Sequence, residues 1–220
     1  ITAQNLTLNA QNSIDNGLGL ISGKNITLNT QSLNNNGDLG QSALGSIISA
    51  DENLIINTQT LNNQNTRATN SAQGLQAKSV QITTQGLDNT SGGIRSTDLT
   101  DISATGKVIN DQGLISSSNK VNIHDDQAAR TISLSNDQGT IVADQELDLN
   151  VKTLNTNGQI TTNGNLNVDL QSDYVQQNSN QLLAGGDLAL TTTGKVTNQS
   201  ELTAGGALSV NAQAFDNQAN

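Results

Sequence analysis

The single histidine of the sequence lies in the stretch HDDQAAR, which brings His124, Asp125, Asp126 and Arg130 close together along the chain. Two carboxylates with a nearby basic side chain are the groups that cleavage of a polysaccharide requires. Their spacing matches no known metal-binding pattern. Ile123 occupies an inward position of a strand-like stretch, so strand alternation turns His124 outward. We therefore interpret HDDQAAR as a solvated loop, and we predict no catalytic residue, no cofactor and no metal site, which means that the protein is not an enzyme.

Two glycine-containing stretches are superficially similar to ligand-binding loops. The nonapeptide Ca²⁺ repeat needs the pattern G-G-x-G-x-D, which the stretch GGDL (Gly185–Leu188) lacks. The stretch GLGLISG (Gly17–Gly23) is similar to a nucleotide-binding loop, but no helical pattern follows it. Neither stretch predicts a ligand site.

The composition excludes several classes of partner. The net charge is −10 and the nine basic residues are scattered, which argues against nucleic acid because a phosphate backbone needs clustered Lys and Arg. No apolar run is long enough to span a bilayer, so we expect no stable membrane insertion. The absence of cysteine excludes disulfides and thiolate metal sites. With 33% hydrophobic residues, one Tyr and one Phe, the core must be narrow and built from Leu, Ile and Val.

The elements that position these side chains repeat about every 20 residues. Apolar pairs with one residue between them recur, as in GNLNV, GDLAL and GALSV, and such alternation is the signature of a strand with one buried face. A further strand around Leu99 fills the double gap between Val80 and Val121. The pairs, which we expect to face the interior, are Leu6/Leu8, Ile26/Leu28, Leu54/Ile56, Val80/Ile82, Val121/Ile123, Leu147/Leu149, Leu166/Val168, Leu188/Leu190 and Leu208/Val210.

A second apolar position follows most of the pairs. These residues are Ile14, Leu33, Leu61, Leu87, Val108, Leu154, Val175, Val196 and Phe215. Two residues later there is usually an asparagine: Asn16, Asn35, Asn63, Asn89, Asn110 and Asn136. A glycine and a third apolar residue follow, as in NDQGLI (Asn110–Ile115). Because Asn and Gly both tolerate the left-handed backbone conformation, we predict that they form the corners of each unit.

A unit with three short apolar segments cannot bury its apolar face alone. Stacking buries it, with each strand paired to the equivalent strand of the next unit. The sequence therefore predicts an all-β fold, a parallel β-helix (β-solenoid) of about ten coils, with residues 1–220 as a single continuous domain. A rod of about 45–50 Å follows from the strand spacing, and the stacked Asn corners are expected to form hydrogen-bonded ladders. The alternatives are a leucine-rich repeat, which needs a different order of leucines, and a disordered chain, which conflicts with the strict apolar spacing.

Three coils carry extra residues, near positions 37–46, 65–73 and 124–130. Insertions in solenoids form loops that often bind partners, although lengthening a loop is also cheap and often has no function. The first two insertions fall at the same corner of consecutive coils, so we expect them to protrude side by side. If this segment binds a partner, the candidate residues are Asp38, Gln41, Ser42, Arg67, Thr69 and Asn70.

The repeating unit G-x-L-x-L…L-x-N-x-x-G-x-I resembles the filamentous haemagglutinin repeat of two-partner-secretion (type V) exoproteins. That family includes large bacterial adhesins and CdiA-type contact-dependent inhibition effectors. The resemblance covers essentially the whole chain. The stretches that show it best are KVINDQGLISSSNKVNI (Lys107–Ile123), SLSNDQGTIVADQELDL (Ser133–Leu149) and GKVTNQSELTAGGALSV (Gly194–Val210).

The resemblance implies a right-handed parallel β-helix that is exported through an outer-membrane secretion transporter and displayed on the bacterial surface as a filament. Nothing in the sequence is similar to the family's N-terminal secretion domain or to a C-terminal toxin, so we expect an internal fragment of a larger protein. Two hypotheses about function follow. The segment is either a structural stalk that presents a distal functional element, or a module that binds a target-cell receptor or glycan through its inserted loops.

Overall fold

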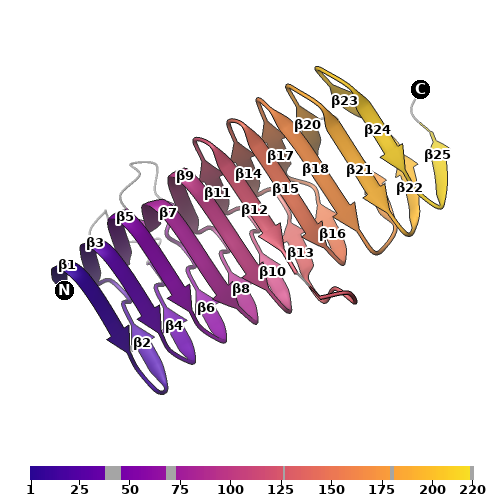
Figure 1. Cartoon of the computed structure of the whole chain (residues 1–220). Coiled ribbons are helices and arrows are strands. Elements are labelled where there is room, and N and C mark those ends of the chain that lie inside the picture. The colour runs from indigo at the N-terminus through magenta and orange to yellow at the C-terminus, as the bar shows by residue number, and fades with distance from the viewer. Residues whose placement is uncertain (38–45, 68–72, 126, 179–180, 219–220) are drawn as a thin grey trace.

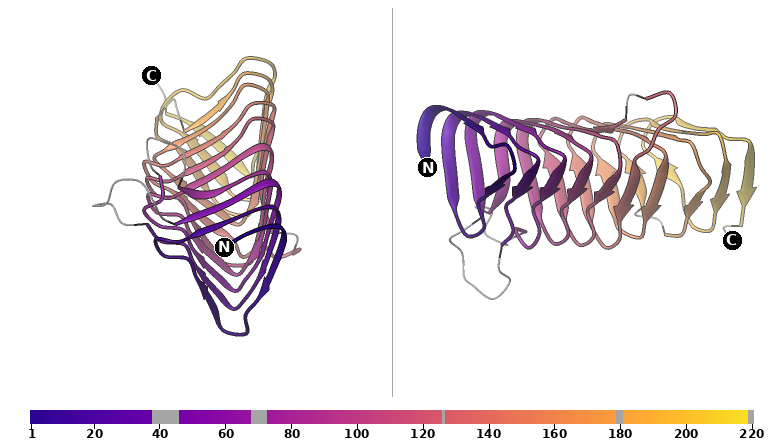
Figure 2. Two further views of the ribbon diagram at one scale, coloured as in Figure 1. Left: turned by 90° about the vertical axis from the view of Figure 1, so that its left-hand side faces the viewer. Right: turned by 90° about the horizontal axis from the view of Figure 1, so that it is seen from below.

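The computed structural model describes residues 1–37, 46–67, 73–125, 127–178 and 181–218. In these parts of the chain every regular element is a strand, and all of the paired strands are parallel (Figure 1). Successive coils stack on one another, and the end-on view of Figure 2 shows the wound cross-section. The protein is therefore an all-β parallel β-helix, as the repeat predicts.

Each coil contributes one strand to a face that carries the apolar pairs, which we call the first face. Its ten strands pair in sequence order, which confirms the prediction of about ten coils. They are β1 (Thr2–Asn9), β3 (Leu20–Asn29), β5 (Ile47–Asn57), β7 (Gly74–Thr84), β9 (Gly93–Ala104), β12 (Lys120–His124), β15 (Glu146–Val151), β18 (Asn165–Leu170), β21 (Leu188–Thr192) and β24 (Leu208–Asn211).

The second face lies just before the first face in each coil. In the early coils one long bent strand covers both faces, as in β9. From the sixth coil onward a turn divides them, and the second face has its own strands. These are β11 (Leu114–Ser117), β14 (Thr140–Ala143), β17 (Gln159–Thr162), β20 (Leu182–Ala184) and β23 (Thr203–Ala204).

The third face follows the first and consists of two separate sheets. The larger sheet contains β2 (Ser13–Asp15), β4 (Ser32–Asn34), β6 (Thr60–Asn62), β8 (Gly86–Asp88), β10 (Lys107–Ile109), β13 (Ser133–Asn136) and β16 (Thr153–Thr156). The smaller sheet contains β19 (Tyr174–Gln176), β22 (Lys195–Asn198) and β25 (Ala214–Asn217).

The apolar pairs fill the interior as predicted. From the second coil to the ninth they are almost fully buried, and in the end coils Leu6, Leu8 and Val210 are partly buried against the same core. Leu208, in the tenth coil, is 47% exposed, so its predicted burial is wrong. The strand that we predicted around Leu99 is confirmed as β9, but its inward residue is Thr100, which pairs with Val80. Thr100 can be buried because its hydroxyl donates to Ser96 Oγ at 2.9 Å, so no polar atom is left without a partner.

The predicted inward position of Val175 is also wrong. The side chain of Tyr174 is 2% exposed, whereas that of Val175 is 37% exposed. Tyr174 pairs with Val196, so the strand lies one residue out of the predicted phase, and a one-residue shift moves every side chain to the opposite face. The Tyr174 hydroxyl donates to Gln176 Oε1 at 2.6 Å, which allows the phenol to be buried.

The predicted asparagine ladder is present and lies in the interior. Asn16, Asn35, Asn63, Asn89, Asn110 and Asn136 are all buried, and each donates from Nδ2 to the Oδ1 of the next at 2.7–2.8 Å. A buried amide costs free energy unless it is hydrogen-bonded, and stacking identical residues satisfies one donor and one acceptor of each. We call the turn that carries this ladder, between the third face of one coil and the second face of the next, the Asn corner.

The role that we predicted for the corner glycines is confirmed at Gly74 (φ 90°), at the end of the second insertion, but is wrong in the regular corners. The left-handed conformation falls on the residue before the glycine, as at Gln112 (φ 56°) and Gln138 (φ 52°). Gly113 is required for a different reason: a Cβ there would lie 2.3 Å from Asn89 O and 2.4 Å from Asn110 Oδ1. The glycine leaves room for the ladder of asparagine side chains, and stacking against the neighbouring coils holds the preceding residue in its uncommon conformation.

Candidate partner-binding surface

The first two insertions both emerge from the Asn corner of consecutive coils. Asp38, Gln41, Ser42, Thr69 and Asn70, which we named as candidate binding residues, lie outside the described residues. The bases of the two insertions are described, and they meet: the Gly37 N–H donates to Gln64 O at 2.8 Å. Ser46 Oγ donates to Asn36 O at 2.5 Å, which brings the two ends of the first insertion together.

Arg67, the one described candidate, is held by the solenoid itself. Its Nη1 donates to Gln112 O at 2.8 Å and to Gly113 O at 3.1 Å. Its Nη2 lies 3.4 Å from Thr140 Oγ1, one coil further along. The guanidinium therefore extends along the rod over coils that follow its own, and much of its hydrogen-bonding capacity is used to fasten corners together.

A second arginine at this corner was missed by the sequence analysis. Arg95 Nη1 donates to Gln73 O, at the end of the second insertion, at 2.9 Å. Burial, and then the nearby positive charge of Arg67, hold the pKa of Arg95 below its ordinary value. No sequence signal marked Arg95, because only the stacking of coils brings it next to Arg67.

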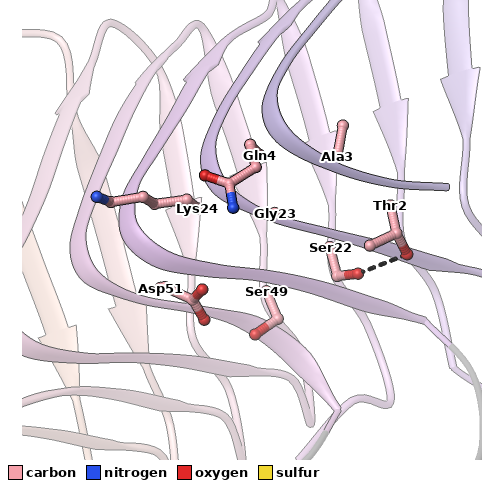
Figure 3. Close-up of a pocket in the computed structure, with 8 residues that line it drawn as sticks. All are labelled: Thr2, Ala3, Gln4, Ser22, Gly23, Lys24, Ser49 and Asp51. Carbon is pink, nitrogen blue, oxygen red and sulfur yellow. Dashed lines mark hydrogen bonds between the residues drawn. The ribbon is translucent and has the colours of Figure 1, made fainter.

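A shallow groove runs along the rod where the early strands bend from the second face to the first (Figure 3). We call it the bend groove. Its walls are mostly short polar side chains, and Thr2 and Ser22 are joined through their hydroxyl oxygens at 2.9 Å. A similar depression continues the groove past Gln76 to Arg95. The lining residues in the close-up are Thr2, Ala3, Gln4, Ser22, Gly23, Lys24, Ser49 and Asp51.

The bend groove can form hydrogen bonds and ion pairs, but it lacks the parts of a catalytic site. Among the described residues, Lys24 and Asp51 form no salt bridge, so both charges face the groove unpaired. The groove has no nucleophile next to a base, and its carboxylate has no neighbouring acid. Its chemistry suits weak, reversible contact with a polar partner.

The stretch HDDQAAR is only partly the solvated loop that we predicted, because Gln127, Ala128 and Ala129 are exposed but Asp125 and Arg130 are not. Asp125 is buried and accepts hydrogen bonds from Thr131 N at 2.6 Å and from Gln127 N at 3.0 Å. Arg130 forms an ion pair with Asp169 at 2.7 Å. His124 lies 3.4 Å from Asp101, and Asp126 lies outside the described residues. Asp125 and Asp169 therefore shape and fasten the loop, and they do not converge on a common point.

The electrostatics of Asp125 fit this structural role. Loss of solvent raises the pKa of the carboxyl group, but the hydrogen bonds from Thr131 and Gln127 outweigh that effect. The net result is a pKa below the ordinary value, so the ionised carboxylate is stabilised where it caps the loop.

The described residues show no group of three or more His, Asp or Glu side chains placed to hold a metal ion. The same parts of the chain contain no helix with the length and apolar character needed to cross a membrane. Candidate sites among the described residues are the bend groove, the bases of the first two insertions and a further depression over β12, β15 and β18, which is lined by His124, Asp148 and Asp169 among others.

The family model described as haemagglutinin repeat matches the chain four times, over residues 1–65, 53–112, 101–169 and 167–220. The chain belongs to the haemagglutinin repeat family. Comparison with curated proteins and with solved structures finds no significant match. Haemagglutinin repeats are structural, adhesin-type sequences, which agrees with a stack of coils whose polar groups serve mainly to hold the coils together.

Proposed function

We propose that this segment is a structural stalk of a secreted, surface-displayed, haemagglutinin-like exoprotein. In this role residues 1–220 act as one continuous repeat domain that holds a distal functional element away from the cell. The observation that supports the proposal most is the core, in which the buried apolar residues from Ile21 to Val196 form one cluster. A solenoid provides reach, because each added coil lengthens the rod by about 4.8 Å and buries its neighbours.

The proposal includes a route to the surface. Membership of the haemagglutinin repeat family supports export by two-partner secretion, through an outer-membrane transporter that is the first partner of the full-length protein. The absence of cysteine supports it as well, since no disulfide can hinder passage of the unfolded chain. The distal element is either an adhesive domain or a contact-dependent inhibition toxin, and both need the same spacer.

The second candidate function is direct binding of a target-cell receptor or glycan. The adjacent bases of the first two insertions favour it, and so do the unpaired charges of Lys24 and Asp51 in the bend groove. Against it stands the scarcity of Tyr, Trp and Arg, the residues that usually dominate binding free energy, because the whole chain has one Tyr and no Trp.

Trimming the insertions in the full-length protein separates the two functions. Residues 38–45 are removed and Gly37 is joined to Ser46, and residues 68–72 are removed so that Arg67 joins Gln73. We expect normal secretion and unchanged attachment to target cells, because a stalk needs only its coils. Normal secretion with loss of attachment would refute the stalk and identify a binding module. A control variant, Asn29→Ala, alters the outer surface of the first face and leaves both insertions in place.

A further inference from the structure

The third face is interrupted between the seventh and eighth coils. Backbone pairing joins β14 to β17 and β15 to β18 across this junction. No register pair among the described residues joins β16 to β19, and the face divides there into its larger and smaller sheets. Every other junction between neighbouring coils is paired on all three faces, so this one has lost a source of stability that the others have.

The interior ladder stops at the same junction. Asn136 donates to Thr156 Oγ1 at 3.3 Å, and Thr156 is the last side chain in the run. In the next coil the equivalent residue, Gln176, donates instead to Asn178 O at 2.9 Å and Glu201 O at 3.1 Å. A polar rung of the kind that links the first seven coils therefore does not continue across the junction through these two side chains. The buried side chain of Gln181 bonds there instead, donating from Nε2 to Thr156 O.

A loop on the outside of the rod crosses this junction. We call residues 127–131, between β12 and β13, the strap; they belong to the sixth coil and stand out from the solenoid (Figures 1 and 2). The backbone N–H of Arg130 donates to Gln171 Oε1 at 3.0 Å, and Gln171 Nε2 donates to Ala128 O at 3.0 Å. The Arg130 guanidinium donates to Asp169 O at 2.9 Å and to Asp169 Oδ2 at 2.7 Å.

These contacts are partly shielded from solvent and reach past a neighbouring coil. Asp169 and Gln171 belong to the eighth coil, so the strap passes over the seventh coil and fastens the one beyond it. The side chain of Arg130 is 14% exposed, which limits screening of its charge, although that of Asp169 is 49% exposed. Asp125 holds the base of the strap through its hydrogen bonds to Thr131 and Gln127, so the strap is anchored on both sides of the junction.

We propose that the strap is a clamp across an intrinsically weak junction, and that coils eight to ten, residues 159–218, open as one unit when it is released. Building on the stalk role proposed above, the junction is the place where the rod yields first under axial load. Opening there removes three coils together. The earlier junctions are held by three paired faces and the buried ladder, and the two later junctions are held by three paired faces.

Hydrogen exchange measured by mass spectrometry on this 220-residue chain tests the clamp. In Arg130→Ala we expect exchange of the strand amides of β17 to β25 to rise together by about tenfold, with β1 to β13 unchanged. Lys120→Ala is the matched control: Lys120 also links the sixth coil to the next, through Asp148 at 2.6 Å, but across a junction with all three faces paired. That variant should leave the exchange of residues 159–218 unaltered.

Two results would overturn the proposal. One is an increase in the exchange rate of Arg130→Ala that is uniform along the chain. The other is an exchange rate that decreases smoothly from the C-terminal end inward with no step at the junction, which is the result expected from fraying of the end. If Arg130→Ala does not fold, the unsubstituted protein still decides the question. Its exchange should show a step between β16 and β17 that grows with ionic strength, and the first three coils should show no such step. Hydrogen exchange reports the opening of coils alone, so a negative result in this experiment would not refute the stalk role. Loss of attachment after trimming of the insertions would likewise not refute the clamp.

Discussion

Removal of one buried asparagine tests whether the interior ladder stabilises the solenoid. Asn110 is fully buried; it accepts from Asn89 Nδ2 and donates to Asn136 Oδ1, both at 2.7 Å, and also to Thr140 O at 3.2 Å. In Asn110→Ala, Asn136 Oδ1 loses the donor that the ladder provides, and Thr140 O loses one donor. Asn89 keeps a weaker bond to Leu114 O at 3.2 Å.

The structure gives the size of the expected loss. A buried polar group left without a partner costs about 1–3 kcal/mol, and the space vacated by the amide adds to that cost. Asn136 Oδ1 loses its donor, and the hydrogen bonding of Asn89 Nδ2 and Thr140 O is weakened. We therefore expect Asn110→Ala to lower the free energy of unfolding by about 2–5 kcal/mol. The assay is equilibrium denaturation in urea followed by circular dichroism, with the slope compared between variants to confirm that the same surface unfolds.

The chain contains a matched control on its surface. Asn25 donates to Asn5 Oδ1 and accepts from Asn53 Nδ2, both at 2.9 Å, so it has the same ladder geometry on the outside of the first face. Water replaces the lost partners there, and Asn25→Ala should cost less than about 0.5–1 kcal/mol. Equal losses for the two variants would refute the argument that burial is what makes the interior ladder matter.

Three further predictions concern the corners, the strap and the core. Gly113→Ala should lower the free energy of unfolding by about 1–3 kcal/mol, because its Cβ would meet Asn89 O at 2.3 Å. Gln112→Gly should leave the free energy of unfolding unchanged or raise it by up to about 1 kcal/mol, because glycine relieves the positive φ. Thermal denaturation that ranks the two variants in the opposite order would contradict the corner geometry. The folded pKa of Asp125 is lowered, so its stabilising effect is present above the ordinary carboxyl pKa of 3.8 and is lost as the pH falls through the lower folded value. As the pH falls, the unsubstituted protein should therefore lose more of its free energy of unfolding than Asp125→Asn does. Parallel curves of stability against pH for the two proteins would disprove this prediction. Leu188→Ala should lower the free energy of unfolding by about 2–5 kcal/mol and Val175→Ala by less than about 0.5 kcal/mol, since only Leu188 is buried. If the two variants lose equally little stability, Leu188 does not face inward.

The period of the apolar residues was enough to determine the architecture. The alternating pairs, their recurrence at coil length and the asparagine two residues after the second apolar position predicted a parallel stack of about ten coils with an asparagine ladder. These features are local and recur in every coil, so a wrong assignment in one coil can be corrected by comparison with the neighbouring coils. They also predicted the inward residues of almost every coil, because a strand has only two faces and burial selects one of them.

Sequence reasoning failed where a coil departs from the repeat by one residue. Neither Thr100 nor Tyr174 could be placed inward from the pattern, since a hydroxyl is buried only if a partner is available, and the partners Ser96 and Gln176 are defined by the fold. The regular corner glycines were assigned to the right positions for the wrong reason, because the crowding that excludes a Cβ comes from the asparagine ladder and from the backbone of the preceding coil.

Contacts between distant coils were decided by the tertiary structure alone. Arg67 reaches Gln112 and Arg130 reaches Asp169, in each case two coils further along the rod, and no spacing in the sequence marks either pair. The sequence determines how each coil is wound, because that depends on neighbours a few residues away. The partners that long side chains find along the rod depend on how coils of unequal length come into register, and only the stacked structure specifies that.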